Sequence, residues 1–435
     1  MRFAPLFAAL ATAAVMMAPA AHASTSWVTM GEEAYVLLLQ ATPNARLISS
    51  RRVTVNAPQL RGSSTLVPGS EMVMAVEVDD ASLDDLSAAV HTQLHKCGGY
   101  MRHESEAEAL AVLHRLGRAP EMQNLPSYAI DNNAEVLARL PMMQAENILS
   151  TITQLQGFQN RRFNSSHGVA ASNWLFNLWT NLNPGTRRDV RVSQITHPGW
   201  PQKSVEFTIL GSGVGNETIV LGAHLDSING GNSTAETQRA PGADDDASGV
   251  ASLTEIIRVM LQSSYRPKRT IRLIAYAAEE VGLRGSQAVV AAQPGRRDKV
   301  VGVLQLDMTA FQGDATDIWI YTDYTSAPQN AFLANLVSVY LPTLTVGYDR
   351  CGYGCSDHAS WFNAGYPVSF PFEASDRTYN FALHTAQDTT ATFGNQANHA
   401  LKFARLAMAF AIELASDSPV IPSAATAAVT AERAR

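Results

Sequence analysis

Residues 217–226 read ETIVLGAHLD, a continuous apolar run that ends in a histidine and an aspartate. Such a run is typical of a buried strand. The next segment, ASGVASLTEIIRVMLQ at 247–262, has apolar residues at helical spacing, and TIRLIAYAAEE at 270–280 is again a buried strand that runs into a turn. The alternation continues with VVGVLQLDMT at 300–309. It predicts an α/β fold, with a mostly parallel twisted sheet and helices on both of its faces.

The same alternation of strand and helix patterns continues on both sides of this stretch. Further strands are expected at 204–210, 318–323 and 366–373, and further helices at 134–158, 169–182, 329–341 and 398–415. We therefore expect one α/β domain over 134–414. The Ala- and Pro-containing tail at 415–435 is expected to be disordered.

Residues 1–23 have the pattern of a secretory signal peptide. Arg2 provides a basic start, an apolar stretch follows, and Ala21-His22-Ala23 places small residues around a cleavage site after Ala23. The apolar stretch is shorter than the about 20 residues that cross a bilayer, and no later charge-free segment reaches that length. The sequence predicts a protein secreted to the periplasm or the medium, with no membrane span in its mature form.

Residues 24–125 are expected to form a separate region with a small α/β or α+β fold. Two of its segments, 78–96 and 104–119, have helical patterns with acidic starts and basic ends. A polar linker at 124–133 follows. No grouping of carboxylates with histidines in this region indicates a site of its own. It is expected to be a propeptide that is removed after export, or else an accessory domain.

The net charge indicates which class of partner to exclude, and the cysteines indicate a disulfide or a metal site. A net charge of −7 and a pI near 5.9 exclude a nucleic-acid partner, because no basic patch is available to neutralise phosphates. The three cysteines are Cys97, Cys351 and Cys355. In an exported protein a Cys351–Cys355 disulfide is favoured over metal ligation, because one short cysteine pair makes a poor structural zinc site.

Acidic residues and histidines gather where the predicted strands end. His224 and Asp226 end the first strand, Glu279 and Glu280 end the next, and Asp307 ends the third. An aspartate triplet at 244–246 precedes the helix that connects the first strand to the second. His384 follows the last strand. In open α/β sheets, ligands bind beyond the carboxyl ends of the strands. Carboxylates together with imidazoles are ligands of zinc, and two ions that share a carboxylate would explain the concentration of acids.

Each of these features has a simpler explanation when it is taken alone. The aspartate triplet favours a helix N-terminus, His224 fits a buried histidine in the core, and Glu279–Glu280 fits a solvated turn. The order of these features along the chain, each at a strand end, favours a common site. Spacing alone does not distinguish Asp245 from its two neighbours.

These motifs resemble those of the co-catalytic zinc aminopeptidases, and most closely the secreted bacterial leucyl aminopeptidases. The segments that carry the resemblance are HLDS (224–227), PGADDDASG (241–249), AYAAEEVGLRGS (275–286), LQLDM (304–308), CGYGCSDHASW (351–361) and HTAQDT (384–389). They occur in the family's order, and the resemblance as a whole covers residues 135–415.

The resemblance implies a site with two zinc ions, in which Asp245 bridges the pair. It implies that His224 and Asp307 complete the protein ligands of one ion, and that Glu280 and His384 complete those of the other. It also implies a cis peptide bond between Asp245 and Asp246.

The resemblance further implies roles for two acids that do not bind metal. Glu279 is expected to be the general base that takes a proton from the attacking water and delivers it to the leaving amine. Asp226 is expected to orient the ring of His224.

For the substrate side chain, the resemblance implies a pocket formed by Tyr353, Phe370, Phe372, Tyr379 and Leu383. Asp376 departs from the family pattern, because close leucine-preferring relatives are expected to have an aromatic residue there. This departure leaves room for polar or basic N-terminal residues. Tyr353 lies between Cys351 and Cys355, so the disulfide is expected to position it.

We therefore expect a secreted metallo-aminopeptidase that acts as a monomer on peptides with a free N-terminus. One alternative is a carboxypeptidase or dipeptidase on the same fold, for which Arg284 and Arg377 are candidates to hold a C-terminal carboxylate. Another is an aminoacyl cyclase that uses one zinc ion. A non-catalytic binding protein and a calcium site at the triplet are disfavoured, because no ligand is missing and the EF-hand spacing is absent.

Overall fold

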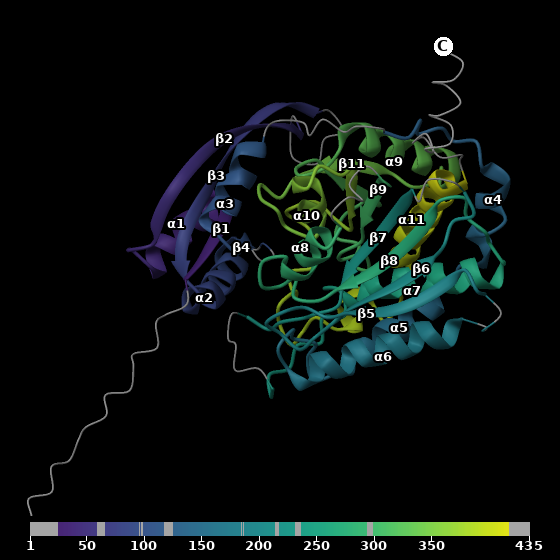
Figure 1. The fold of residues 1–435 in the computed structure, drawn as a ribbon, viewed down its shortest axis with the longest axis horizontal. Coiled ribbons are helices and arrows are strands. Elements are labelled where there is room, and N and C mark those ends of the chain that lie inside the picture. Colours follow the sequence, from purple (N-terminus) through teal and green to yellow (C-terminus); the bar gives the residue numbers. More distant parts are fainter. Residues whose placement is uncertain are drawn as a thin grey trace, which may run out of the picture.

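The computed structural model describes residues 25–58, 66–94, 96, 99–116, 125–183, 185, 187–213, 217–230, 236–293 and 299–416. The predicted signal peptide, Cys97 and the tail beyond Ser416 lie outside these residues. The described residues form an N-terminal region, 25–116, and a larger part that begins at residue 125, with the two side by side in Figure 1.

The N-terminal region is a four-stranded antiparallel sheet with helices, in the strand order β2-β3-β1-β4. Its elements are β1 Thr25–Gly31, α1 Glu32–Ala41, β2 Arg46–Pro58, β3 Leu66–Asp79, α2 Ala81–Ala89, a π-helical turn Val90–Leu94, β4 Tyr100–His103 and α3 Glu106–Arg115. Val28, Leu38 and Val76 are fully buried in a core of its own. The predicted helices correspond to α2 and α3. Ser105 caps α3 by accepting the N–H of Glu108 at 3.2 Å.

The larger part is built on an eight-stranded sheet in the order β11-β10-β12-β9-β7-β8-β6-β5. The strands are β5 Val190–Ile195, β6 Ser204–Ile209, β7 Thr218–His224, β8 Thr270–Tyr276, β9 Val300–Gln305, β10 Ile318–Tyr321, β11 Val346–Asp349 and β12 Val368–Phe372. The central strands β12, β9, β7 and β8 are parallel. Antiparallel pairing begins at β6 on one side and β10 on the other. The mostly parallel sheet expected from the sequence is confirmed.

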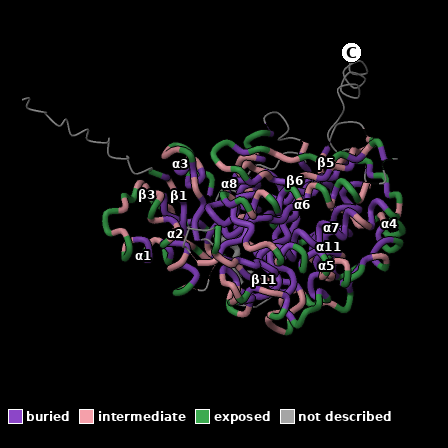
Figure 2. The backbone as a smooth tube through the Cα atoms, turned by 90° about the horizontal axis from the view of Figure 1, so that it is seen from below, coloured by how far each residue is buried: buried purple, intermediate pink, exposed green. Residues whose placement is uncertain are grey.

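Helices cover both faces of this sheet, as expected. They are α4 Asn133–Leu137, α5 Ala145–Gln156, α6 Ser166–Leu182, α7 Ala247–Gln262, α8 Arg284–Ala291, α9 Ala327–Tyr340, α10 His358–Asn363 and α11 Asn398–Ser416, with 3-10 turns at Leu140–Met142 and Thr390–Phe393. Both sides of β7 are buried: Leu221 packs in the core with α5, α7, α9 and α11, and Val220 packs in the core with α8 and α10. Burial on both faces explains why the central strands read as continuous apolar runs. Figure 2 shows the buried backbone concentrated in the middle of this part.

Direct contacts join the two parts. The N–H of Arg102 donates to the carbonyl of Gly282 at 3.1 Å, and the Arg115 guanidinium donates to the carbonyl of Asn363 at 2.8 Å. Glu71 forms an ion pair with Arg350 at 2.6 Å. The N-terminal region therefore packs against the loop before α8, the last residue of α10 and the segment after β11. In the described part of the chain, no helix has the length and apolarity needed to span a bilayer.

Candidate metal centre and active site

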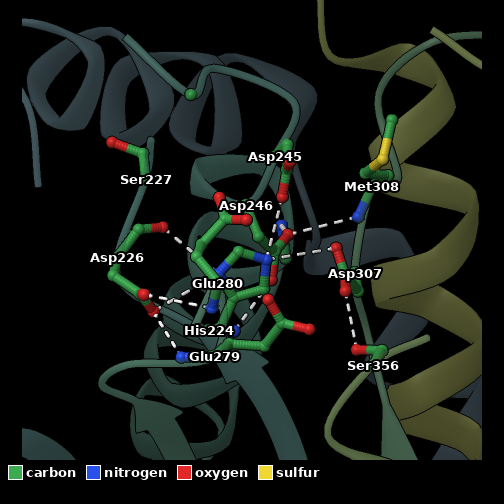
Figure 3. A network of polar contacts seen from close by, with 12 residues as sticks. His224, Asp226, Ser227, Asp245, Asp246, Glu279, Glu280, Asp307, Met308 and Ser356 are labelled. Carbon is green, nitrogen blue, oxygen red and sulfur yellow. Dashed lines mark hydrogen bonds and ion pairs between the residues drawn. The ribbon is translucent and has the colours of Figure 1, made fainter. Parts of the chain in front are cut away.

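The strand topology brings the predicted site residues together. His224 is the last residue of β7, Glu279 and Glu280 lie in the turn after β8, and Asp307 lies two residues beyond β9. Since β7, β8 and β9 run in parallel, their carboxyl ends meet at one edge of the sheet. Figure 3 shows these side chains converging with Asp245, which precedes α7.

Asp245 lies between the two imidazoles that the sequence singled out. Its Oδ1 is 2.9 Å from Nε2 of His224, and its Oδ2 is 3.1 Å from Nε2 of His384. On the first side, Asp307 Oδ1 is 3.4 Å from the same His224 nitrogen. On the second side, Glu280 Oε2 is 2.6 Å from the His384 nitrogen. The five residues thus form two adjoining groups that share the carboxylate of Asp245.

The aspartate triplet divides into three separate tasks. Asp246 is the N-cap of α7, and its carboxylate accepts the N–H groups of Gly249 at 2.8 Å and of His224 at 2.9 Å. Asp244 accepts the N–H of Ala310 at 2.9 Å. Of the three, Asp245 has the ion-pair contacts with both imidazoles. The Asp245–Asp246 peptide bond is cis, as the resemblance implied.

The donor atoms of this group fit a cation. Each of the five residues has a buried side-chain atom with no hydrogen-bond partner, and these atoms are His224 Nε2, Asp245 Oδ2, Glu280 Oε1, Asp307 Oδ1 and His384 Nε2. Buried polar atoms are normally satisfied, so five together call for a ligand. Two overlapping groups have the geometry to hold a metal ion: His224, Asp245 and Glu280, and His224, Asp246 and Asp307. In the second group we favour Asp245 over Asp246, because backbone N–H groups already occupy the Asp246 carboxylate.

The electrostatics of the site also favour a bound cation. Burial alone would lower the pKa of His384, but the carboxylates of Glu280 and Asp245 raise it to about 10. Burial and the neighbouring Asp245 raise the pKa of Glu280 to about 7. In this arrangement the imidazole protons offset the charge of the acids. A divalent cation would take the place of those protons, because metal ligation requires neutral imidazole and ionised carboxylate.

Glu279 belongs to the same turn as Glu280 but has different surroundings. Its side chain is buried, and burial raises its pKa well above the usual value, with Glu280 acting in the same sense. Its backbone N–H donates to Asp226 Oδ1 at 3.0 Å, and the N–H of Glu280 donates to Asp226 Oδ2 at 3.2 Å. One carboxylate therefore holds the backbone of both glutamates.

The contact of Asp226 with His224 differs in detail from the expected one. The carboxylate of Asp226 lies 3.7 Å from Nδ1 of His224, beyond hydrogen-bond distance. The backbone carbonyl of Asp226 lies 3.2 Å from the same nitrogen and is its hydrogen-bond partner. Asp226 thus orients the ring through its main chain, while its side chain holds the Glu279–Glu280 turn.

Sequence reasoning missed two residues that support the loop of the triplet. Arg161 is fully buried, and its guanidinium donates to the carbonyls of Leu225 and Gly242 at 2.8 and 2.9 Å, and also to that of Pro241. Asp388 Oδ2 accepts the N–H of Asp245 at 3.1 Å. The HTAQDT segment contained Asp388, whereas no motif marked Arg161.

A pocket adjoins the centre at Asp307. Its lining includes four of the five residues expected around the substrate side chain: Tyr353, Phe370, Phe372 and Tyr379. The fifth, Leu383, is fully buried in the apolar cluster behind them. The Cys351–Cys355 disulfide is present, and both of its cysteines line the pocket.

The two arginines considered for binding a C-terminal carboxylate lie in other settings. Arg284 stacks its guanidinium on the ring of Trp200, 4.4 Å from the ring centroid. Arg377 is exposed. Neither residue lines the pocket next to the metal centre.

This chain is similar to known proteins in both sequence and structure. The family model described as Peptidase family M28 matches residues 205–409. A protein named leucine aminopeptidase 1 from Grosmannia clavigera is 34% identical over 323 residues, which is 71% of this chain and 76% of that protein.

Two solved structures from Legionella pneumophila extend over the N-terminal region as well. The LapA aminopeptidase is 30% identical, with a TM-score of 0.70, and LapB is 28% identical, with a TM-score of 0.73. Each match covers 91% of this chain and 100% of the other. The resemblance inferred from the sequence motifs is confirmed, and this chain belongs to Peptidase family M28.

Proposed function

We propose that this protein is a secreted aminopeptidase that removes N-terminal residues from peptides at a site with two zinc ions. The observation that carries the proposal is the carboxylate of Asp245, which lies between His224 and His384 with one oxygen toward each ring. The names of the relatives, leucine aminopeptidase and LapA aminopeptidase, support the reaction class. The signal-peptide pattern of residues 1–23 supports secretion, and we propose that the mature form is a monomer.

The five residues with unsatisfied buried atoms would hold the two ions. His224 and Asp307 would bind one ion, Glu280 and His384 the other, and Asp245 both. When bound, zinc ions polarise the scissile carbonyl and lower the pKa of water. The Ser356 hydroxyl donates to Asp307 Oδ2 at 2.6 Å, which leaves Oδ1 to face the centre. Such hydrogen bonds fix the orientation of a ligand.

Glu279 would serve as general base and then as general acid. Its carboxyl is buried next to the ligands, and no role in metal binding is assigned to it. It would take the proton of the attacking water and transfer it to the amine that leaves when the peptide bond breaks. Asp226 accepts the N–H groups of Glu279 and Glu280, and this would fix the turn with one side chain available to water and the other to metal.

The proposal is tested by metal analysis of the purified full chain together with a panel of substrates. We expect about two zinc ions per chain, loss of activity on chelation, and recovery when zinc is added. Leucine p-nitroanilide should be cleaved, and its N-acetylated form should not, because the reaction requires a free α-amine. Cleavage of peptides from the C-terminus, or cyclisation of N-terminal glutamine, would identify one of the alternative enzymes instead.

A further inference from the structure

The pocket beside the metal centre is aromatic, but it is not purely apolar. Its walls include Tyr321, Tyr353, Phe370, Phe372 and Tyr379, together with the Cys351–Cys355 disulfide. Asp307 lies where the pocket meets the candidate metal ligands. Its lining includes one further acidic residue, Asp376. A pocket made only for aliphatic side chains would gain nothing from a carboxylate in its wall, because desolvating a charge is costly.

The backbone around Asp376 is held in place. Its N–H donates to Asp349 Oδ2 at 3.0 Å, and Asp349 is fully buried at the end of β11. Burial, and after it the carboxylates of Asp376 and Asp349, raise the pKa of the Tyr321 hydroxyl well above its usual value. This end of the pocket is therefore electronegative, and the position of Asp376 follows from the fold of the loop.

A cationic side chain already lies at this pocket. Lys96 of the N-terminal region is part of its lining, and its ammonium is 5.9 Å from the ring centroid of Tyr353. The ammonium also donates to the carbonyl of Cys351 at 3.2 Å and forms an ion pair with Glu33 at 2.8 Å. Aromatic faces and carboxylates both attract ammonium groups. The pocket is thus compatible with a lysine side chain.

We propose that this pocket binds the side chain of an N-terminal lysine or arginine and that Asp376 determines this preference. The aromatic walls would cover the methylene groups, while the carboxylate of Asp376 would accept hydrogen bonds from the ammonium or guanidinium. This proposal rests on the aminopeptidase function proposed above and adds the class of residue removed. Asp376 is a specificity-determining residue here, and it takes no part in the bond-breaking step.

The first test compares lysine, arginine and leucine p-nitroanilides as substrates of the full chain. We expect the ratio of kcat/KM for lysine over leucine to exceed one and to fall about tenfold or more in Asp376→Asn, as expected for the loss of a charge-assisted hydrogen bond. Asp376→Glu should retain part of the preference. Glu146→Gln is the matched control, because it removes one negative charge from an exposed position on α5. The series is repeated in a Lys96→Ala background, which removes the positive charge that lies beside Tyr353.

A second measurement does not depend on catalysis, and its wild-type arm does not depend on the folding of a variant. Lysinamide and norleucinamide share an α-amine and an aliphatic stem, and only lysinamide has a terminal ammonium. Calorimetric titration of the wild-type and Lys96→Ala chains should give tighter binding of lysinamide by about tenfold. Equal binding of the two amides, or a lysine-to-leucine ratio that is the same in wild type and Asp376→Asn, would overturn the proposal. If no nitroanilide is cleaved at all, even after release of residues 24–125, the proposed function fails, and the two amides still decide whether the pocket selects basic side chains.

Discussion

The imidazole of His91 lies against that of His384, with the ring centroids 5.5 Å apart. His91 belongs to the π-helical turn after α2, so the N-terminal region reaches the candidate metal centre itself. Lys96, a few residues further on, lies at the adjoining pocket. The same short segment therefore covers both a predicted metal ligand and the space expected for the substrate side chain.

Separation of residues 24–125 from the rest of the chain should increase activity. A site-specific protease sequence placed after Asn124 allows cleavage of the intact protein, and leucine p-nitroanilide reports activity before and after. If the site is exposed in only about a tenth of the uncleaved molecules, the apparent affinity for substrate should rise about tenfold once the region is released. A chain with a scrambled cleavage sequence is treated in the same way as the control. Unchanged kinetics after complete release would mean that the region does not limit access.

Glu279→Gln should abolish turnover without removing metal. Glutamine has nearly the same shape but cannot accept a proton from water, and general acid–base catalysis typically contributes about 100-fold to 10,000-fold. The measurement is kcat together with zinc content by mass spectrometry. Glu146→Gln, on the exposed face of α5, should leave both unchanged. Substantial activity in Glu279→Gln would assign the base to another group.

Asp226→Asn should weaken both catalysis and metal retention. The asparagine side chain has one acceptor oxygen in place of two, so either Glu279 or Glu280 loses the hydrogen-bond partner of its N–H. Groups that orient metal ligands are typically worth about 10-fold to 100-fold in metal affinity or activity. Zinc affinity can be measured by competition with a chelator, alongside kcat. A variant that loses neither would show that the turn holds its shape without this carboxylate.

Reduction of the Cys351–Cys355 disulfide should change substrate affinity more than metal binding. Both cysteines line the pocket beside the centre, and neither belongs to the group of candidate ligands. We expect KM to rise severalfold on treatment with a reductant while zinc content stays constant. The double variant Cys351→Ser/Cys355→Ser should show the raised KM without a reductant and should not respond to one. A constant KM in the reduced protein would contradict a positioning role for the disulfide.

His399 should make the protein less stable in mild acid. Burial, and then the nearby ammonium of Lys402, lower the pKa of its imidazole to about 4. Lys402 donates to Nδ1 at 3.0 Å, so Nδ1 must accept, and Nε2 donates to the carbonyl of Glu373 at 3.2 Å. Between pH 6.5 and 4 the unfolded chain binds more protons at this residue than the folded one. The free energy of unfolding therefore falls as the pH falls, by up to about 1.4 kcal/mol per pH unit.

The measurement is denaturant unfolding between pH 4 and 7. His399→Gln removes the titrating group while keeping an acceptor for Lys402, so its unfolding free energy should depend less on pH in this window. Equal slopes for the variant and the wild type would show that this imidazole does not contribute.

The sequence predicted the centre of the fold better than its edges. The strand β7 and the helix α7 appeared as a long apolar run and a clear helical period, and α7 spans the expected residues 247–262. Strand β5, VRVSQI, was missed because it lies at the sheet edge, where it is mostly exposed or half-buried. No individual strand of the N-terminal region was predicted; β2, at the edge of its sheet, carries arginines and serines.

For the candidate site, the sequence predicted which residues meet, because the ends of parallel strands share one edge. The sequence did not predict the contacts that are made through the main chain. Arg161 acts on carbonyl groups and Asp388 on amides, and neither kind of contact depends on the identity of the partner side chain. The division of tasks within 244–246 also depends on the direction in which each carboxylate points.

The hydrogen bonds from the N–H groups of Glu279 and Glu280 to Asp226 have a consequence for the evolution of the reaction. A small shift of this turn carries Glu279 and Glu280 in the same direction, so the gap between them hardly alters. A substitution that displaces Asp226 would therefore disturb the candidate base and the candidate ligand at once, so that neither glutamate can be retuned independently of the other.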